Sequence, residues 1–159
     1  MRALRIGGWA NLAIAAAHVI TLIWAWTFFG WVGIEPEMRD LANQGAALPY
    51  ILTLITAGFF LVFGLYALSG AGDLRRLPLL RSVLLFIAVI YLLRATLGGG
   101  IADVLAGDVK QSVFAAIALL IGLCYATGAV ALRRRHSAAT GTGAWRTGPA
   151  IPQREESRA

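Results

Sequence analysis

The sequence has few charged side chains and few residues that bind metals or form disulfides. Of its 159 residues only 14% are Asp, Glu, Lys or Arg, whereas 58% are hydrophobic. About a quarter of the residues in a soluble domain are charged, so this composition is typical of a membrane protein. The single cysteine, Cys124, excludes an internal disulfide and a Cys-x-x-Cys pair, which argues against a thiol oxidoreductase.

Histidine is equally scarce, and the common catalytic motifs are missing. Of the two histidines only His18 lies in an apolar run, so one chain cannot supply both axial ligands of a haem, although a homodimer would. Zinc needs three or four clustered ligands, and none cluster. No phosphate-binding loop is present, and neither Ser82 nor Ser112 has a nearby His–Asp set. We therefore expect no metal, no cofactor and no catalytic residue.

Four long apolar runs make up most of the chain. They cover residues of about 6–29, 48–68, 78–97 and 112–132. At 1.5 Å per residue, about 20 helical residues cross a hydrocarbon core of about 30 Å. We therefore predict an all-α integral membrane four-helix bundle formed by residues 1–135.

The segments around these runs have their own signals. The first run ends in aromatic residues of the kind that gather at a membrane interface, which indicates a retained helix rather than a signal peptide. In the next loop, Pro36 and Gly45 suit the start and the end of a short helix lying on the membrane surface. Residues 136–159 are polar and rich in Gly, Ala, Thr and Pro, and they predict a disordered cytoplasmic tail.

Charge is distributed unevenly between the two sides. Basic residues are concentrated before the first run, in segment 69–81 and after residue 132, whereas the loops after the first and third runs are net acidic. The positive-inside rule then places both termini in the cytoplasm and, in a bacterium, the bundle in the inner membrane. The net charge of +6 is explained by membrane lipid as partner, without nucleic acid.

Small residues recur at helical spacing in the first and last runs. The first run has Ala13, Ala17, Thr21 and Ala25; the last has Ala118, Gly122 and Ala126. Such rows let helices approach closely in lipid. We expect contacts inside the bundle, and the alternative is a face that binds other membrane subunits or a second copy.

Polar and ionisable residues inside the runs are the candidate site. Asn11 and His18 lie seven residues apart, roughly on one face of the first run, and Tyr91 and Arg94 share part of a face in the third. Ionisable groups within a span usually face the bundle interior and have a partner. In the structural interpretation, His18 makes an interhelical hydrogen bond.

In the same interpretation, Arg94 forms an ion pair with the acidic loop, where the candidate partners are Glu35, Glu37 and Asp40. The alternative is a pocket open to the periplasm, with His18 at its floor, Arg94 at its rim and walls of Trp24, Trp26 and Tyr91. Such a pocket would take an anionic or quinone-like ligand.

Three short segments carry a resemblance. They are 65–72 (LYALSGAG), 76–81 (RLPLLR) and 90–94 (IYLLR). Within about residues 6–97, the chain resembles small four-helix bacterial inner-membrane proteins to which we can attach no activity. The resemblance implies a bacterial inner-membrane setting and nothing about chemistry.

We therefore expect a non-enzymatic accessory or assembly subunit that packs through small-residue helix faces. The alternative is a protein that binds or transports a small anionic, lipid or quinone-like molecule through His18, Arg94, Tyr91, Trp24 and Asn11.

Overall fold

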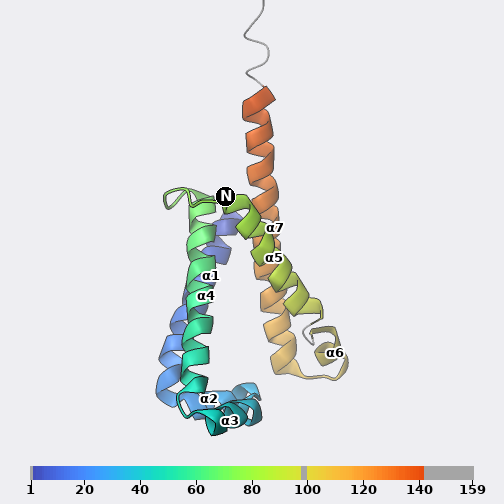
Figure 1. Ribbon diagram of the computed structural model, residues 1–159. Coiled ribbons are helices and arrows are strands. Elements are labelled where there is room, and N and C mark those ends of the chain that lie inside the picture. The colour runs from blue at the N-terminus through green and yellow to red at the C-terminus, as the bar shows by residue number, and fades with distance from the viewer. Residues whose placement is uncertain (1, 98–99, 142–159) are drawn as a thin grey trace, which may run out of the picture.

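The computed structural model describes residues 2–97 and 100–141, and every regular element in these ranges is helical (Figure 1). The elements are α1 (Arg2–Thr21), the 3₁₀ helix η1 (Leu22–Trp24), α2 (Ala25–Val32), α3 (Glu35–Gln44), α4 (Leu48–Ala71), α5 (Leu80–Thr96), α6 (Gly100–Leu105) and α7 (Val109–Gly141). The predicted all-α fold is confirmed for this part of the chain.

Three helical stretches are long and apolar enough to cross a membrane: Arg2–Val32, Leu48–Ala71 and Val109–Arg134. They indicate a multi-pass membrane protein. The predicted four-span bundle is therefore confirmed only in part, because α5 has 17 residues and is shorter than the run 78–97. The helix begins late because Leu79 has a left-handed backbone with φ 51°, which no α-helix contains.

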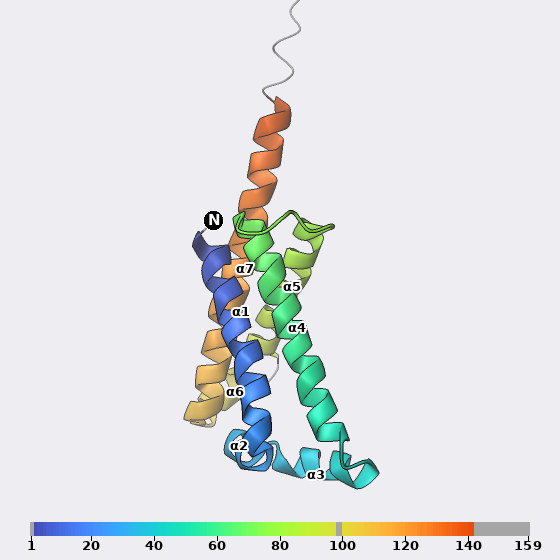
Figure 2. The ribbon, with the colours of Figure 1, turned by 90° about the vertical axis from the view of Figure 1, so that its left-hand side faces the viewer.

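The first apolar run is not one straight helix, which corrects the prediction of a single helix over 6–29. α1 ends at Thr21, Trp24 leaves the helical backbone region with φ −123° and ψ 39°, and α2 then turns across the end of the molecule (Figures 1 and 2). Contacts with α7 hold α2 there. Lys110 Nζ donates to the Trp31 carbonyl at 3.0 Å, and the Trp31 ring meets Phe114 edge-on.

The four long helices form two antiparallel hairpins. α1 packs mainly on α4 and α5 mainly on α7, and the hairpins meet through α1 with α7 and α4 with α5. Figure 1 shows the hairpins close together at the end with the N-terminus and apart at the end with α2, α3 and α6. The C-terminal part of α7 extends beyond the other helices at the end of the bundle where the chain begins.

Glycines set the closest approach of α1 and α4. A Cβ added at Gly64 would lie 3.0 Å from the Gly8 carbonyl oxygen and 2.8 Å from the Leu12 side chain. The backbones can therefore pass at this distance only without a side chain at position 64. On α7, Gly122 plays the same part, because its Cβ would lie 3.1 Å from Tyr91 of α5.

The two small-residue rows have different surroundings. In α7, Ala118 and Gly122 are buried against α5, as expected for contacts inside the bundle. In α1, Ala13 and Ala17 are exposed on the outer surface. The expectation of a bundle contact is therefore wrong for the first half of the α1 row, because Leu4, Gly7, Gly8 and Asn11 form the buried face of this helix.

The end of the bundle near the N-terminus is closed by polar contacts. Arg5 Nε donates to Asp73 at 2.7 Å, and a second guanidinium nitrogen binds the other carboxylate oxygen. This hydrogen bonding lowers the pKa of Asp73 below the ordinary value of an aspartate. The Ser69 hydroxyl donates to the Arg75 carbonyl at 2.8 Å and accepts from the Leu77 amide, which fixes the loop between α4 and α5.

The remaining boundaries follow the sequence closely. The short helix predicted between Pro36 and Gly45 is α3. Residues 108–111 (DVKQ) have the spacing of a capping box, with Asp in place of Ser or Thr, and this pattern predicts a helix start. Asp108 Oδ1 accordingly accepts from the Lys110 and Gln111 amides at the start of α7. α7 continues to Gly141, so the first residues of the predicted tail 136–159 are helical, and residues 142–159 lie outside the described ones.

We expect Gly64→Ala to lower the free energy of unfolding by about 1–3 kcal/mol, because the added methyl group forces α1 away from α4. Gly58→Ala is the matched control on the same helix, since a Cβ there meets nothing within 4 Å. It should leave stability unchanged or raise it by up to about 1 kcal/mol. Reversible unfolding in mixed micelles, followed by circular dichroism, measures both. Equal effects of the two variants would contradict the role of Gly64 in the helix crossing.

Candidate functional site

A chain of buried hydrogen bonds lies at the centre of the bundle. Tyr91 Oη donates to Asn11 Oδ1 at 2.5 Å, and Asn11 Nδ2 donates to Tyr125 Oη at 3.0 Å. Tyr125 Oη in turn donates to the Phe63 carbonyl at 2.7 Å. The second Asn11 amide hydrogen is directed to the Gly7 carbonyl at 3.0 Å. We call these three side chains, Asn11, Tyr91 and Tyr125, the Asn–Tyr network.

The direction of each bond follows from what each atom can do. The Gly7 carbonyl can only accept, so the amide nitrogen of Asn11 must face it, and the amide oxygen is left for the Tyr91 hydroxyl. The Phe63 carbonyl likewise accepts, which directs the Tyr125 proton away from Asn11. Four helices contribute to the network: α1 with Asn11, α4 with Phe63, α5 with Tyr91 and α7 with Tyr125.

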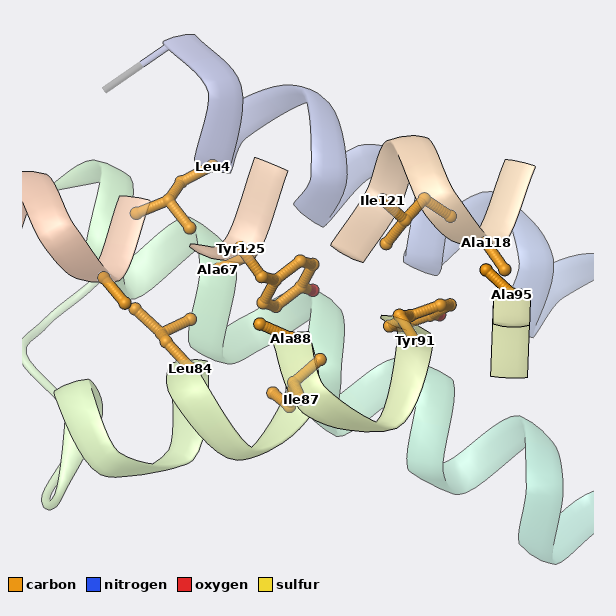
Figure 3. Packing of buried hydrophobic residues seen from close by; sticks show 11 residues of the cluster. Leu4, Ala67, Leu84, Ile87, Ala88, Tyr91, Ala95, Ala118, Ile121 and Tyr125 are labelled. Carbon is orange, nitrogen blue, oxygen red and sulfur yellow. The ribbon is translucent and has the colours of Figure 1, made fainter. Parts of the chain in front are cut away.

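The aromatic rings support the same junction. The rings of Tyr91 and Tyr125 stack with centroids 6.2 Å apart and planes 27° apart, and Phe63 meets Tyr91 at 6.4 Å. Figure 3 shows the two tyrosines, from α5 and α7, among Leu4, Ala67, Ala88 and other buried apolar side chains. Gly7 lets Tyr125 come close to α1, because a Cβ at this position would lie 3.1 Å from the ring.

Every donor hydrogen in the network is engaged. Asn11 is fully buried, and both of its amide hydrogens and its oxygen are engaged. Across the described residues, each buried side-chain nitrogen or oxygen has a hydrogen-bond partner. In the same ranges, no three His, Cys, Asp or Glu side chains gather as metal ligands would. The chemistry that this arrangement supports is interhelical hydrogen bonding, which holds helices together in lipid.

The structure brings together two of the predicted site residues, Asn11 and Tyr91, and separates the others from them. His18 is half-buried, its Nδ1 lies 2.8 Å from the Ile14 carbonyl within α1, and its ring lies 5.0 Å from that of Phe60. The structural interpretation predicted an interhelical hydrogen bond for His18, whereas this bond lies within α1. His18 contacts α4 through the ring of Phe60 instead. Trp24 is 63% exposed.

The acidic segment has an internal partner. Arg39 Nε donates to Glu35 at 2.8 Å, one turn apart in α3, and the Arg39 guanidinium lies 5.3 Å from the Trp26 ring. Arg39 therefore ties α3 to α2. Arg94 lies on the exposed side of α5. Glu35 pairs with Arg39, and pairing of Arg94 with Glu35, Glu37 or Asp40 stays a prediction.

The structure has a surface hollow, but not at the position where the sequence analysis predicted a pocket. A hollow of about 480 Å³ is lined by Arg2, Arg5, Ile6 and Trp9. It lies at the N-terminal end of α1, away from the α2 and α3 end where the sequence placed a pocket between His18 and Arg94. None of the predicted ligand-binding residues lines it.

Tyr125 is the member of the network that the sequence analysis missed. It stands seven residues after Ala118, so it falls on the same helical face as the small-residue row of α7. A hydroxyl group on a face already predicted to be internal was the available signal. The position of its partner, Asn11, is 114 residues away in the chain.

Comparisons with known proteins find no matching family model, no matching curated protein and no matching solved structure. The resemblance to small inner-membrane proteins therefore stays a prediction from the sequence. The structure shows a small all-helical protein with three candidate membrane-spanning helices.

We expect Tyr125→Phe to cost more stability than Tyr91→Phe. Each variant strands one group of Asn11: Tyr125→Phe strands an amide hydrogen and Tyr91→Phe strands the amide oxygen. Tyr125→Phe also removes the bond to the Phe63 carbonyl, so it should cost about 2 kcal/mol and Tyr91→Phe about 1 kcal/mol. Unfolding in mixed micelles gives both values. Tyr50→Phe, in the first turn of α4, is the control and should change little. The reverse order of the two core variants would contradict the assignment of two bonds to Tyr125 and one to Tyr91.

Proposed function

We propose that this chain is a four-span membrane protein that catalyses no reaction and serves as an accessory or assembly subunit for other membrane polypeptides. The observation that carries the proposal is the Asn–Tyr network, in which every donor hydrogen is engaged. Its polar groups bind one another and the backbone, so the interior is devoted to holding four helices together. A partner would therefore bind to the outer surface of the bundle.

The path of the chain supports a fourth crossing by α5. α4 ends at the loop beside Arg5, whereas α7 starts at the opposite end beside Trp31. α5 has to carry the chain between these ends, and its 17 residues extend about 25 Å, near the lower limit for a spanning helix. Its outer side is as apolar as that of its neighbours: Phe86 is 63% exposed, compared with 59% for Phe59 of α4 and 64% for Leu120 of α7.

The charges at the two ends support the proposed orientation. Arginines gather at the end formed by the start of α1, the α4–α5 loop and α7 beyond Leu132, among them Arg2, Arg5, Arg75, Arg76, Arg133 and Arg134. The opposite end has the acidic residues of α3. By the positive-inside rule the arginine end is cytoplasmic, which places both termini in the cytoplasm and, in a bacterial cell, the protein in the inner membrane.

The exposed half of the α1 row supports a contact with another helix. Ala13 and Ala17 lie one turn apart on the outer surface, and neither has a side chain that would keep a second helix at a distance. The partner is another membrane subunit or a second copy of this chain. The alternative function, small-molecule binding around His18 and Arg94, has less support because Tyr91 is engaged by Asn11 and Trp24 is exposed.

We expect single cysteines to be labelled from opposite sides of a sealed membrane. In a Cys124→Ser background, Arg76→Cys should react with an impermeant maleimide from one side, and Asn43→Cys and Ala106→Cys from the other. All three residues are exposed and lie at loop or interfacial positions. Labelling of Ala106→Cys from the same side as Arg76→Cys would show that α5 does not cross, and would contradict the four-span topology.

We expect a photoreactive amino acid at Ala13 or Ala17 to crosslink to a polypeptide in the native membrane, either a second copy or another membrane protein. The same amino acid at Phe86, on the outer side of α5, is the matched control and should label mainly lipid. Mass spectrometry of the crosslinked products identifies the partner. If lipid were the main product at all three positions, the accessory-subunit proposal would fail.

A further inference from the structure

The hollow at the start of α1 is a candidate binding site that the proposed function does not use. Its four lining residues, Arg2, Arg5, Ile6 and Trp9, have the spacing i, i+3, i+4 and i+7, so they form one stripe along the helix. The stripe faces away from the bundle: Ile6 is 64% and Trp9 61% exposed. We call it the Arg2–Trp9 stripe. It has two guanidinium groups at its outer end and an apolar floor further along α1.

The charge of this stripe is only partly balanced. Two N–H groups of Arg5 bind Asp73, and a guanidinium has five such donors, so three are left for another acceptor. The Arg5 side chain is 54% exposed, and Arg2 is exposed as well. Among the described residues, Asp73 is the acidic residue at the end of the bundle near the N-terminus, whereas several further arginines lie there. An anion is therefore the ligand that these two guanidinium groups favour.

We propose that the Arg2–Trp9 stripe binds the headgroup of an anionic phospholipid. The lipid phosphate would accept hydrogen bonds from Arg2 and from the remaining donors of Arg5, since guanidinium matches phosphate oxygens in geometry. The start of an acyl chain would lie along Ile6 and the Trp9 indole. This inference rests on the proposed function to the extent that α1 must cross a bilayer.

The depth of the residues favours a lipid over a free anion. Seven residues of helix separate Arg2 from Trp9, a rise of about 10 Å. The headgroup region of one leaflet is about 5–7 Å thick, so arginines at phosphate level put the indole at the edge of the hydrocarbon core, where Trp is most favourable. A soluble anion would leave Ile6 and Trp9 uncovered, whereas a phospholipid covers both ends of the hollow.

Native mass spectrometry of the protein released from nanodiscs tests this proposal. The nanodiscs contain phosphatidylcholine with a minor share of phosphatidylglycerol, and the measured quantity is the ratio of the two lipids retained. We expect the wild-type protein to retain phosphatidylglycerol above its share in the nanodisc. Arg2→Gln should reduce this enrichment about fivefold, because one arginine near an anionic surface contributes about that factor. Trp9→Ala should lower the amount of both lipids retained and leave their ratio unchanged, because Trp9 contacts the acyl chain that both lipids have.

Arg134→Gln is the matched control, since it removes one exposed arginine at the same end of the bundle but outside the hollow. It should leave the enrichment unchanged. Equal losses for Arg2→Gln and Arg134→Gln would show a general effect of charge and would overturn the site. Release of the retained lipid by inorganic phosphate would show that a free anion suffices, and would overturn the assignment to a phospholipid.

The same preparation separates failure of this inference from failure of the proposed function. A chain that does not incorporate into nanodiscs refutes the membrane-spanning proposal and the lipid site with it. A chain that incorporates but retains the two lipids in their nanodisc proportions refutes the lipid site alone.

Discussion

The bundle depends on one asparagine amide placed where water does not reach. Asn11 has two hydrogens and one oxygen to satisfy, and in the core of a bundle surrounded by lipid each unsatisfied group would cost several kcal/mol. The structure satisfies them with one group from α1 itself and one each from α5 and α7. Because Tyr125 in turn donates to the Phe63 carbonyl of α4, the correct placement of four helices is needed to complete the network. This is specificity that apolar packing alone does not provide in lipid.

Close packing and hydrogen bonding depend on each other in this bundle. The hydroxyl of Tyr125 reaches Asn11 only because Gly7 leaves room for its ring, and α4 comes near α1 only because Gly64 has no side chain to meet the Gly8 carbonyl. The hairpins are closest at the N-terminal end, where Leu4 is buried against Gly70 and Gly128, and they separate toward α2 and α3 (Figure 1). The bundle is therefore most constrained around the network and the arginine end.

Much of the fold was predictable because membrane helices are marked by length and hydrophobicity. The all-α class, the interfacial helix α3 and the cap at Asp108 all came from local patterns. The break at Trp24 was not predictable from a local pattern. The contacts that hold α2 join Trp31 to Lys110 and Phe114, which are distant in the sequence. Of the candidate site, Asn11 and Tyr91 were predicted as members but not as partners of each other. His18 and Arg94 drew attention because charge is costly in lipid, while Tyr125 did not stand out.

The division between a closed interior and an open surface decides where function is to be sought. A ligand would have to bind hydrogen-bonding groups that are not already engaged, and Asn11 has no donor hydrogen left. The residues with capacity to spare lie outside: Arg2 and Arg5 beside an apolar hollow, and Ala13 and Ala17 on the face that a second helix could approach. All four belong to α1, whose opposite face has the buried residues Leu4, Gly7, Gly8, Asn11 and Ala15. One face of α1 therefore holds the bundle together, and the other is left for lipid or for a partner.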